Sequence, residues 1–332
     1  MSSTVQARAR DNPFDVALRD TNNDLTKLQA LYHKHRCTRN SQQKTLILDS
    51  NFSGWSLDAV LMKLEGPARD PTYKDPRQNA IVWARPPQPV QDLVEKIQKN
   101  IQNVAPNGIC PGLWMMPREN LHMTSLEIAH SLTKDQLEEL FVPLHQGLSQ
   151  IANYTYDHRT RLVKPFISYD RSGLALSFLP AAGEGLARST RTADDDKYTY
   201  HHLRRDIHQI AVDTGTPIRS RYVVPSAHVT IARFITNKDF RLQGEEHGQI
   251  DTQKVKTFIN KIESLNAWLQ AEYWPEDSHY SIKKGGEWLV GEERGLDCQK
   301  GPVWYGHNHR VMVGRGFPPN QLERRVHVKA RL

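Results

Sequence analysis

Two short segments of the chain repeat one pattern of residue types, and this repeat constrains the fold more than any other feature. Residues 114–124 (WMMPRENLHMT) and residues 222–230 (YVVPSAHVT) both run from an aromatic residue through two apolar residues and a proline to His-apolar-Thr. A single His-x-Thr arises by chance in many chains of this length, whereas two copies in matching frames rarely do. The repeat therefore predicts a duplicated unit whose equivalent residues converge on one cleft.

The hydrophobic pattern around the repeat predicts a mixture of strands and helices. Between the two motifs the predicted order is strand, helix, strand, strand, helix, strand, which is nearly palindromic. Turns of hairpin length, as at residues 171–173, favour an α+β fold over a doubly wound parallel sheet. The predicted helices span 23–33, 89–104, 133–152, 200–212 and 252–273, and the predicted strands span 80–84, 113–116, 121–128, 162–170, 174–179, 222–224, 227–235, 287–290, 302–305 and 311–313.

The N-terminal part of the chain differs in character from the rest. The segment at residues 66–78 (GPARDPTYKDPRQ) gathers three prolines and several charges, which is typical of a linker or an exposed loop. Regular patterning begins only after it. We therefore expect an N-terminal extension at residues 1–75, partly helical or irregular, followed by one two-lobed domain at residues 76–332.

Composition narrows the class of protein. No apolar run approaches the ~18 residues that cross a bilayer, and the first ten residues lack the apolar core of a secretory signal. Three widely spaced cysteines give neither a disulfide framework nor a Cys-x-x-Cys metal site, and they suit a reducing compartment. We expect a cytoplasmic or nuclear protein without a membrane span, whose formal charge of +7 suits nucleotides or RNA as partners.

The His-x-Thr motifs suit chemistry at a phosphodiester. Because side chains alternate along a strand, His122 shares a face with Thr124, and His228 shares a face with Thr230. Imidazole, with an ordinary pKa of about 6.5, can serve one motif as base and the other as acid. The threonine hydroxyls can donate hydrogen bonds to phosphate oxygens, so the set needs no metal and no cofactor.

At these residues the chain resembles the 2H phosphoesterase superfamily, which is defined by two His-x-Thr/Ser motifs. The segments LHMTSLEI and AHVTIARF carry the resemblance. Residues 287–306 (EWLVGEERGLDCQKGPVWYG) also resemble the last strand pair of the branch described as RNA ligase/cyclic nucleotide phosphodiesterase. The resemblance covers residues 80–315, and residues 1–75 have no recognised counterpart.

The resemblance implies a bilobal fold, with two antiparallel-rich sheets and flanking helices around a central groove. It implies a cyclic phosphodiesterase that hydrolyses a 2′,3′-cyclic phosphate, in a nucleotide or at an RNA end, without a metal. His122 and His228 become the acid–base pair, with His228 favoured as base, and Thr124 and Thr230 become the phosphate-binding hydroxyls. After Tyr305 the branch continues with glycines, where this chain has His307, Asn308 and His309.

Other residues near the motifs are candidates for binding substrate. Tyr222, Trp304 and Tyr305 are aromatic residues that can stack on a base. Arg233 has odd parity relative to His228, so strand alternation predicts that it points away from the cleft. Arg219 and Arg221 are better placed to meet phosphate, although a solvated surface role is the simpler interpretation.

Two alternative functions stay open at this point. One is a non-catalytic module that uses the cleft to hold a nucleotide or an RNA end, and the other is an exonuclease that trims RNA 3′ ends. A metal site is a further candidate, formed by His201, His202 and His208 near the acidic residues 194–196. The spacing of these histidines instead favours a polar helix face beside a loop. No pattern in the sequence sets the oligomeric state, and a monomer is the default expectation.

Overall fold

The computed structural model describes residues 12–66, 68–103, 112–185, 193–242, 248–275, 282–302, 305 and 309–317. The helices are α1 (Asp15–Asp20), α2 (Leu25–Ile47), α3 (Ala59–Leu64), α4 (Gln88–Gln102), α5 (Lys134–Asp157), α6 (Tyr200–Asp213) and α7 (Thr252–Tyr273). The strands are β1 (Gln78–Ala84), β2 (Leu113–Met115), β3 (Met123–Leu132), β4 (Thr160–Asp170), β5 (Gly173–Pro180), β6 (Ala227–Phe234), β7 (Glu287–Val290), β8 (Arg294–Gly301) and β9 (His309–Arg315). None of these helices has the length and apolar character needed to cross a membrane.

The strands of the described residues join in one antiparallel sheet. Their order is β7-β4-β5-β6-β3-β1-β8-β9, and β2 pairs with β6 beside this path. The α+β prediction is confirmed at the level of an antiparallel sheet with flanking helices. The expectation of two separate sheets was wrong, because β3 and β6 are joined through the pair Met123 and Val229. The strands that carry the two motifs therefore lie side by side at the centre of the sheet.

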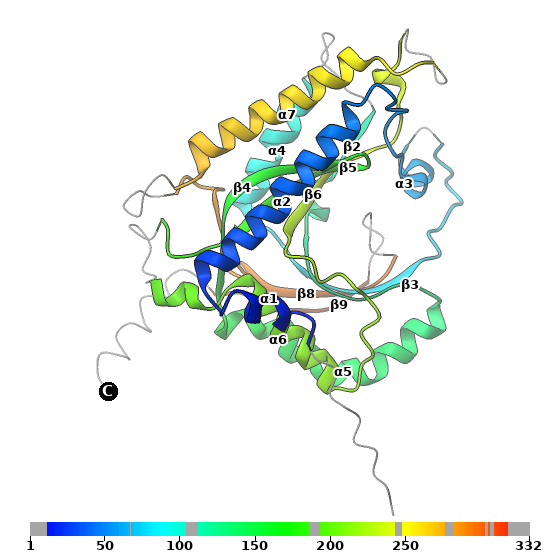
Figure 1. Cartoon of the computed structure of the whole chain (residues 1–332). Coiled ribbons are helices and arrows are strands. Elements are labelled where there is room, and N and C mark those ends of the chain that lie inside the picture. The colour runs from blue at the N-terminus through cyan, green and yellow to red at the C-terminus, as the bar shows by residue number, and fades with distance from the viewer. Residues whose placement is uncertain are drawn as a thin grey trace, which may run out of the picture.

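The long helices pack on the sheet in two groups (Figure 1). Helix α7 contacts β4, and α4 contacts both α7 and β6. Helix α5 contacts β8 and β9, and α6 contacts both α5 and β3. Helix α4 precedes the first motif and packs on β6, which carries the second motif. Helix α6 precedes the second motif and packs on β3, which carries the first.

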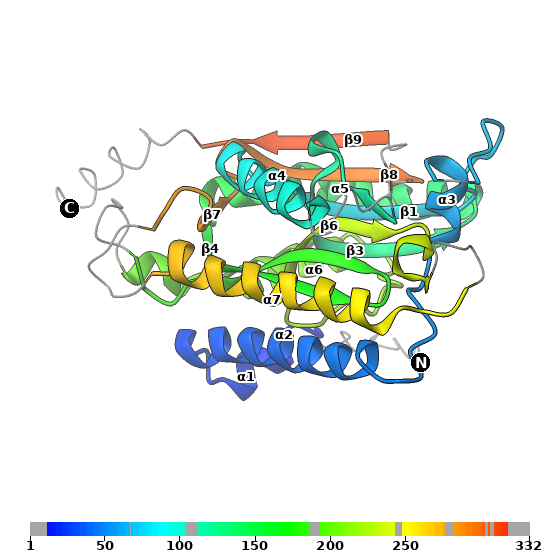
Figure 2. The same cartoon turned by 90° about the horizontal axis from the view of Figure 1, so that it is seen from above.

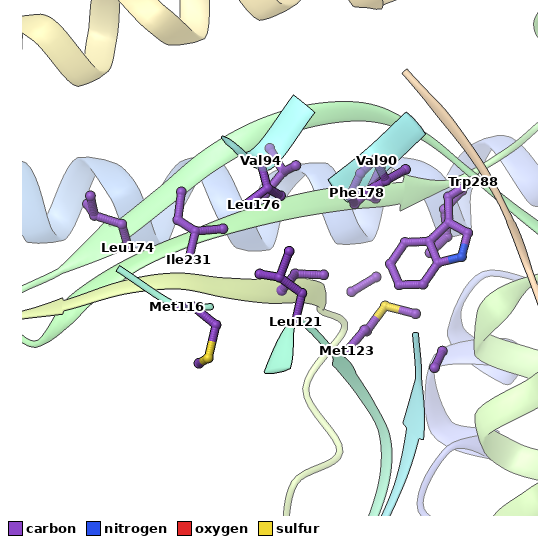
Figure 3. Close-up of a cluster of buried hydrophobic side chains, with 14 of the residues drawn as sticks. Val90, Val94, Met116, Leu121, Met123, Leu174, Leu176, Phe178, Ile231 and Trp288 are labelled. Carbon is purple, nitrogen blue, oxygen red and sulfur yellow. The ribbon is translucent and has the colours of Figure 1, made fainter. Parts of the chain in front are cut away.

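The hydrophobic core lies behind the motif strands (Figure 3). Helix α4 places Val90 and Val94 in it, and β5 places Leu176 there. Met123 and Val229, the middle residues of the two motifs, are 1% and 0% exposed in the same cluster. Burial of these middle residues fixes which face of each motif strand turns away from the core, because neighbouring side chains alternate.

Helix α2 packs against β4 and β5 and is longer than predicted. It begins after Asp24, whose side chain accepts a hydrogen bond from the Lys27 amide at 2.8 Å, and it continues well past residue 33. Figure 2 shows α1 and α2 at the edge of the molecule farthest from β9. Helix α2 contacts β4 and β5, so residues of the N-terminal segment belong to the same hydrophobic core as the sheet.

Side-chain amides explain why α2 is held against β4. Strand β7 pairs with β4 only from Thr160 to Val163, so the rest of this edge needs other partners. Asn40 of α2 donates to the Ile167 carbonyl at 2.9 Å and accepts from the Tyr169 amide at 3.3 Å. Asn266 of α7 bonds both the amide and the carbonyl of Ile167. Helices α2 and α7 therefore satisfy the edge that β7 leaves open.

Three strand predictions differ from the structure. Residues 222–224 form no strand, and the segment at 302–305 is irregular where it is described. The segment at 287–306 does not form a strand pair: β7 pairs with β4, whereas β8 lies between β1 and β9. Strand β8 was not predicted, because its sequence RGLDCQKG lacks a clear apolar alternation.

Candidate active site

The two His-x-Thr motifs meet in antiparallel register. Met123 pairs with Val229 across β3 and β6. In an antiparallel pair, the residue after one partner lies opposite the residue before the other. His122 therefore lies across from Thr230, and Thr124 lies across from His228.

The burial pattern shows that the four motif side chains share one face. Met123 and Val229 are buried, whereas the histidines and threonines on either side of them are half-buried. All four line one pocket of about 130 Å³, and Tyr222, Arg233, Glu127, Met116 and Tyr305 complete its lining. We call this the histidine pocket. The predicted convergence of the two motifs is thus present.

His122 is fixed in orientation by two contacts. Its Nδ1 lies 2.7 Å from the Asn120 carbonyl, which can only accept, so Nδ1 carries a proton. Its ring stacks on the Trp83 indole with centroids 3.9 Å apart. Trp83 is held in turn by Arg85, whose guanidinium lies over the indole and donates to Asp297. His122 therefore offers the pocket its Nε2 with a free lone pair whenever the ring is neutral.

His228 has a different kind of partner. Its Nδ1 lies 2.9 Å from Ser226 Oγ and 3.2 Å from the Tyr222 hydroxyl. A hydroxyl can both donate and accept, so this environment suits either tautomer and also the protonated ring. The two histidines are thus equivalent in sequence but differ in what surrounds Nδ1.

A buried arginine shapes the segment that carries Tyr222 and Ser226. Arg204 of α6 is 0% exposed and donates to the carbonyls of Tyr222, Val224 and Ser125 at 2.6–3.1 Å. These bonds take the place of strand pairing, which explains why the predicted strand at 222–224 is absent. Arg204 also ties this segment to β3, and so holds the partners of His228 in place.

Arg233 lies in the pocket, contrary to the prediction from strand parity. The register between β5 and β6 shifts here: Ala175 pairs with Thr230, but Leu174 pairs with Ala232. The extra residue is a β-bulge, which reverses the alternation beyond Thr230. Arg233 consequently lines the histidine pocket together with Thr230. Arg219 and Arg221 are exposed and lie outside this lining.

Burial and positive charge lower the pKa of both motif histidines. Desolvation is the largest cause in each case and brings the pKa of His122 to about 3 and that of His228 to about 4. The Arg233 guanidinium lowers both values further, and Arg85 adds to the effect on His122. Both rings are therefore neutral at pH 7, and a bound anion would raise both pKa values.

The aromatic candidates for substrate binding have different positions. Tyr222 and Tyr305 both line the histidine pocket. The Tyr305 hydroxyl donates to Asp58, which caps α3, so this wall of the pocket is tied to the N-terminal segment. Trp304 lies outside the described residues.

Two histidines of α6 are held by hydrogen bonds to other parts of the chain. His201 bonds Tyr32 and the Phe14 carbonyl through its two ring nitrogens. His202 likewise bonds Thr199 and Asn23. Both are buried against the N-terminal segment, so the prediction of a polar helix face was wrong. Within the described ranges, no group of three or more His, Cys, Asp or Glu side chains is placed to hold a metal ion.

Comparison with known proteins yields no assignment. No family model and no curated protein matches the chain. Among solved structures, a conserved protein of unknown function, ATU0111 from Agrobacterium tumefaciens, is 12% identical with a TM-score of 0.41, over 77% of this chain and 99% of its own. TT0787 of Thermus thermophilus is 11% identical with a TM-score of 0.36, over 72% of this chain and 98% of its own.

Proposed function

We propose that the chain hydrolyses a 2′,3′-cyclic phosphate by acid–base catalysis between two histidines. The observation that carries this proposal is the histidine pocket, where His122, His228, Thr124, Thr230 and Arg233 line one small space. Two imidazoles supply proton transfer, while two hydroxyls and a guanidinium supply hydrogen-bond donors for phosphate oxygens. The proposal places the chain as a distant relative of the 2H phosphoesterase superfamily.

The reaction follows from these groups. Thr124, Thr230 and Arg233 donate hydrogen bonds to the non-bridging oxygens of the cyclic phosphate. One neutral histidine takes a proton from water, and the water oxygen forms a bond to phosphorus. The bond from phosphorus to one ribose oxygen breaks, and the other histidine, protonated, gives its proton to that oxygen. The products are an open phosphomonoester and a free ribose hydroxyl.

The partners of Nδ1 favour His122 as the base. Its Nδ1–H is fixed on the Asn120 carbonyl, so Nε2 is unprotonated and ready to accept a proton. His228 faces Ser226 and Tyr222, which tolerate a doubly protonated ring. This assignment reverses the preference drawn from the sequence alone.

Matching contacts between the two halves of the chain support the proposed two-lobed duplication. Helix α4, β2, β3 and α5 follow one another in the first half, and α6, residues 219–224, β6 and α7 follow in the second. Strand β2 pairs with β6, and the Arg219 amide correspondingly bonds the Ile128 carbonyl of β3. These two contacts are equivalent under the proposed duplication, and they support a pseudo-two-fold arrangement around a central groove.

An assay with 2′,3′-cyclic AMP tests the proposal. We expect conversion to one adenosine monophosphate, with the 2′- and 3′-phosphate products separated by chromatography. Tight binding without product would favour the non-catalytic module instead. Stepwise shortening of a short oligonucleotide would favour the trimming exonuclease.

A further inference from the structure

The histidine pocket adjoins a larger space beside helix α2. A chamber of about 320 Å³ shares Tyr222, His228, Thr230 and Arg233 with it. We call this the arginine chamber, because Arg36 and Arg39 of α2 form its other wall. A further hollow between α2 and Pro225 shares His35 and Arg39 with the chamber and adds Lys34. The three spaces thus adjoin one another between the motifs and α2, and together we call them the path.

The path has an excess of positive charge. Its lining includes the cations Lys34, Arg36, Arg39 and Arg233 and the carboxylates Glu127 and Asp170. Asp170 is already engaged, because Oδ1 accepts from Ser172 and Gly173 and Oδ2 accepts from Arg39. Although burial opposes it, these bonds keep the pKa of Asp170 below its usual value. Asp170 is therefore ionised at neutral pH and balances one of the four cations.

Arg39 is the cation best placed to reach a ligand. Its side chain is 53% exposed, and its ion pair with Asp170 is a surface pair, which is worth only about 0–1 kcal/mol. An incoming phosphate can therefore compete for this guanidinium. Arg36 contributes positive charge from a buried position, where its side chain is 4% exposed and packs on the rings of Phe166 and Trp274. Among the described residues, no ion pair is found for Arg36.

We infer that α2 forms a second anion-binding site, which takes the phosphates of a substrate longer than one nucleotide. This inference rests on the proposed function of the histidine pocket. With the terminal phosphate between the motifs, the next phosphate along a ribonucleotide chain lies in the arginine chamber. Arg39 contacts this second phosphate directly, and the buried charge of Arg36 stabilises it. Lys34 contacts the part of the ribonucleotide that extends beyond the chamber over α2.

Binding of unreactive products tests the second site without depending on catalysis. The probes are 3′-AMP and the trinucleotide ApApAp, which also ends in a 3′-phosphate, and Kd is measured at several NaCl concentrations. We expect ApApAp to bind at least about tenfold more tightly, with a steeper salt dependence. Arg39→Gln and Lys34→Gln should each flatten the slope of log Kd against log[NaCl] by about 0.7 for ApApAp.

Lys27→Gln is the matched control, because Lys27 lies exposed on the same helix and lines none of the three spaces. Lys27→Gln should leave the ratio of the Kd for 3′-AMP to the Kd for ApApAp unchanged. Arg39→Lys should restore part of the ratio that Arg39→Gln loses. Equal Kd values for the two probes, or equal losses in Arg39→Gln and Lys27→Gln, would overturn the second site. If ApApAp binds as expected but no cyclic phosphate is hydrolysed, the second site stands and the proposed function fails.

Discussion

The imidazole of His122 lies against the indole of Trp83, with centroids 3.9 Å apart and planes inclined by 20°. One face of the catalytic candidate is thus closed to water by a side chain from β1. Arg85, which lies over the same indole, keeps positive charge nearby. This combination of desolvation and positive charge brings the pKa of His122 to about 3.

The affinity of the histidine pocket for an anion should rise as pH falls. Because burial holds the pKa of both motif histidines at about 3 and 4, binding of an anion must draw protons onto them. Sulfate is a suitable probe, since it does not titrate between pH 8 and pH 5. We expect Kd for sulfate to decrease over that range in calorimetric titrations, and the decrease to vanish in the double variant His122→Gln/His228→Gln. A pH-independent Kd would contradict the proton linkage.

The free energy of unfolding should fall as the protein is acidified. His122, His201, His202 and His228 have pKa values of about 3 to 4 in the folded state, chiefly because of burial, against about 6.5 when unfolded. The unfolded chain therefore binds more protons, so stability is complete above pH 6.5 and is lost progressively as pH falls toward 4. Urea unfolding at half-unit pH steps measures this loss. A stability that is constant from pH 6.5 to pH 4.5 would argue against buried neutral histidines.

Arg233 should matter more for turnover than the arginines favoured by the sequence. Arg233→Gln removes a charged donor from the pocket, which should lower kcat/KM for 2′,3′-cyclic AMP by about 10- to 100-fold. Arg221→Gln is the control, because Arg221 is exposed outside the pocket. It should change kcat/KM less than twofold. Similar losses in both variants would show that overall charge, rather than position, is responsible.

Loss of either motif histidine should abolish most turnover. His122→Ala and His228→Ala each remove one proton-transfer group, for which we expect losses of about 10²–10⁴-fold in kcat. His130→Ala, at an exposed position on β3, provides the control. Activity should persist in EDTA, because no step of the proposed reaction uses a metal. Full activity in either motif variant would exclude the acid–base mechanism, whereas inhibition by EDTA would indicate a metal-dependent one.

Arg204 should be important for stability as well as for the site. Arg204→Gln leaves the carbonyls of Ser125, Tyr222 and Val224 without their buried donor. We expect the free energy of unfolding to fall by at least about 2 kcal/mol, measured by urea denaturation. Arg205→Gln, on the next residue of α6 and partly exposed, should cost much less. If the two variants were equally stable, the carbonyl contacts of Arg204 would not hold the segment.

The local pattern of the sequence predicted much of the framework. Period-two alternation placed His122 and Thr124 on one face of a strand, and the burial of Met123 confirms it. Helical periodicity predicted α4 and α7 closely. These features depend on contacts between residues near one another in the chain, which is why a single sequence is sufficient for them.

The composition of the site beyond the motifs was decided by tertiary structure. Arg233 enters the pocket only because a bulge after Thr230 reverses strand alternation, and the bulge is visible only in pairing with β5. Arg39 reaches the path because Asn40 anchors α2 on the open edge of β4, far away in the chain. The sequence thus determined which side chains share a strand face, through local backbone geometry. Long-range pairing, which depends on how distant segments satisfy each other's hydrogen bonds, determined which cations surround them.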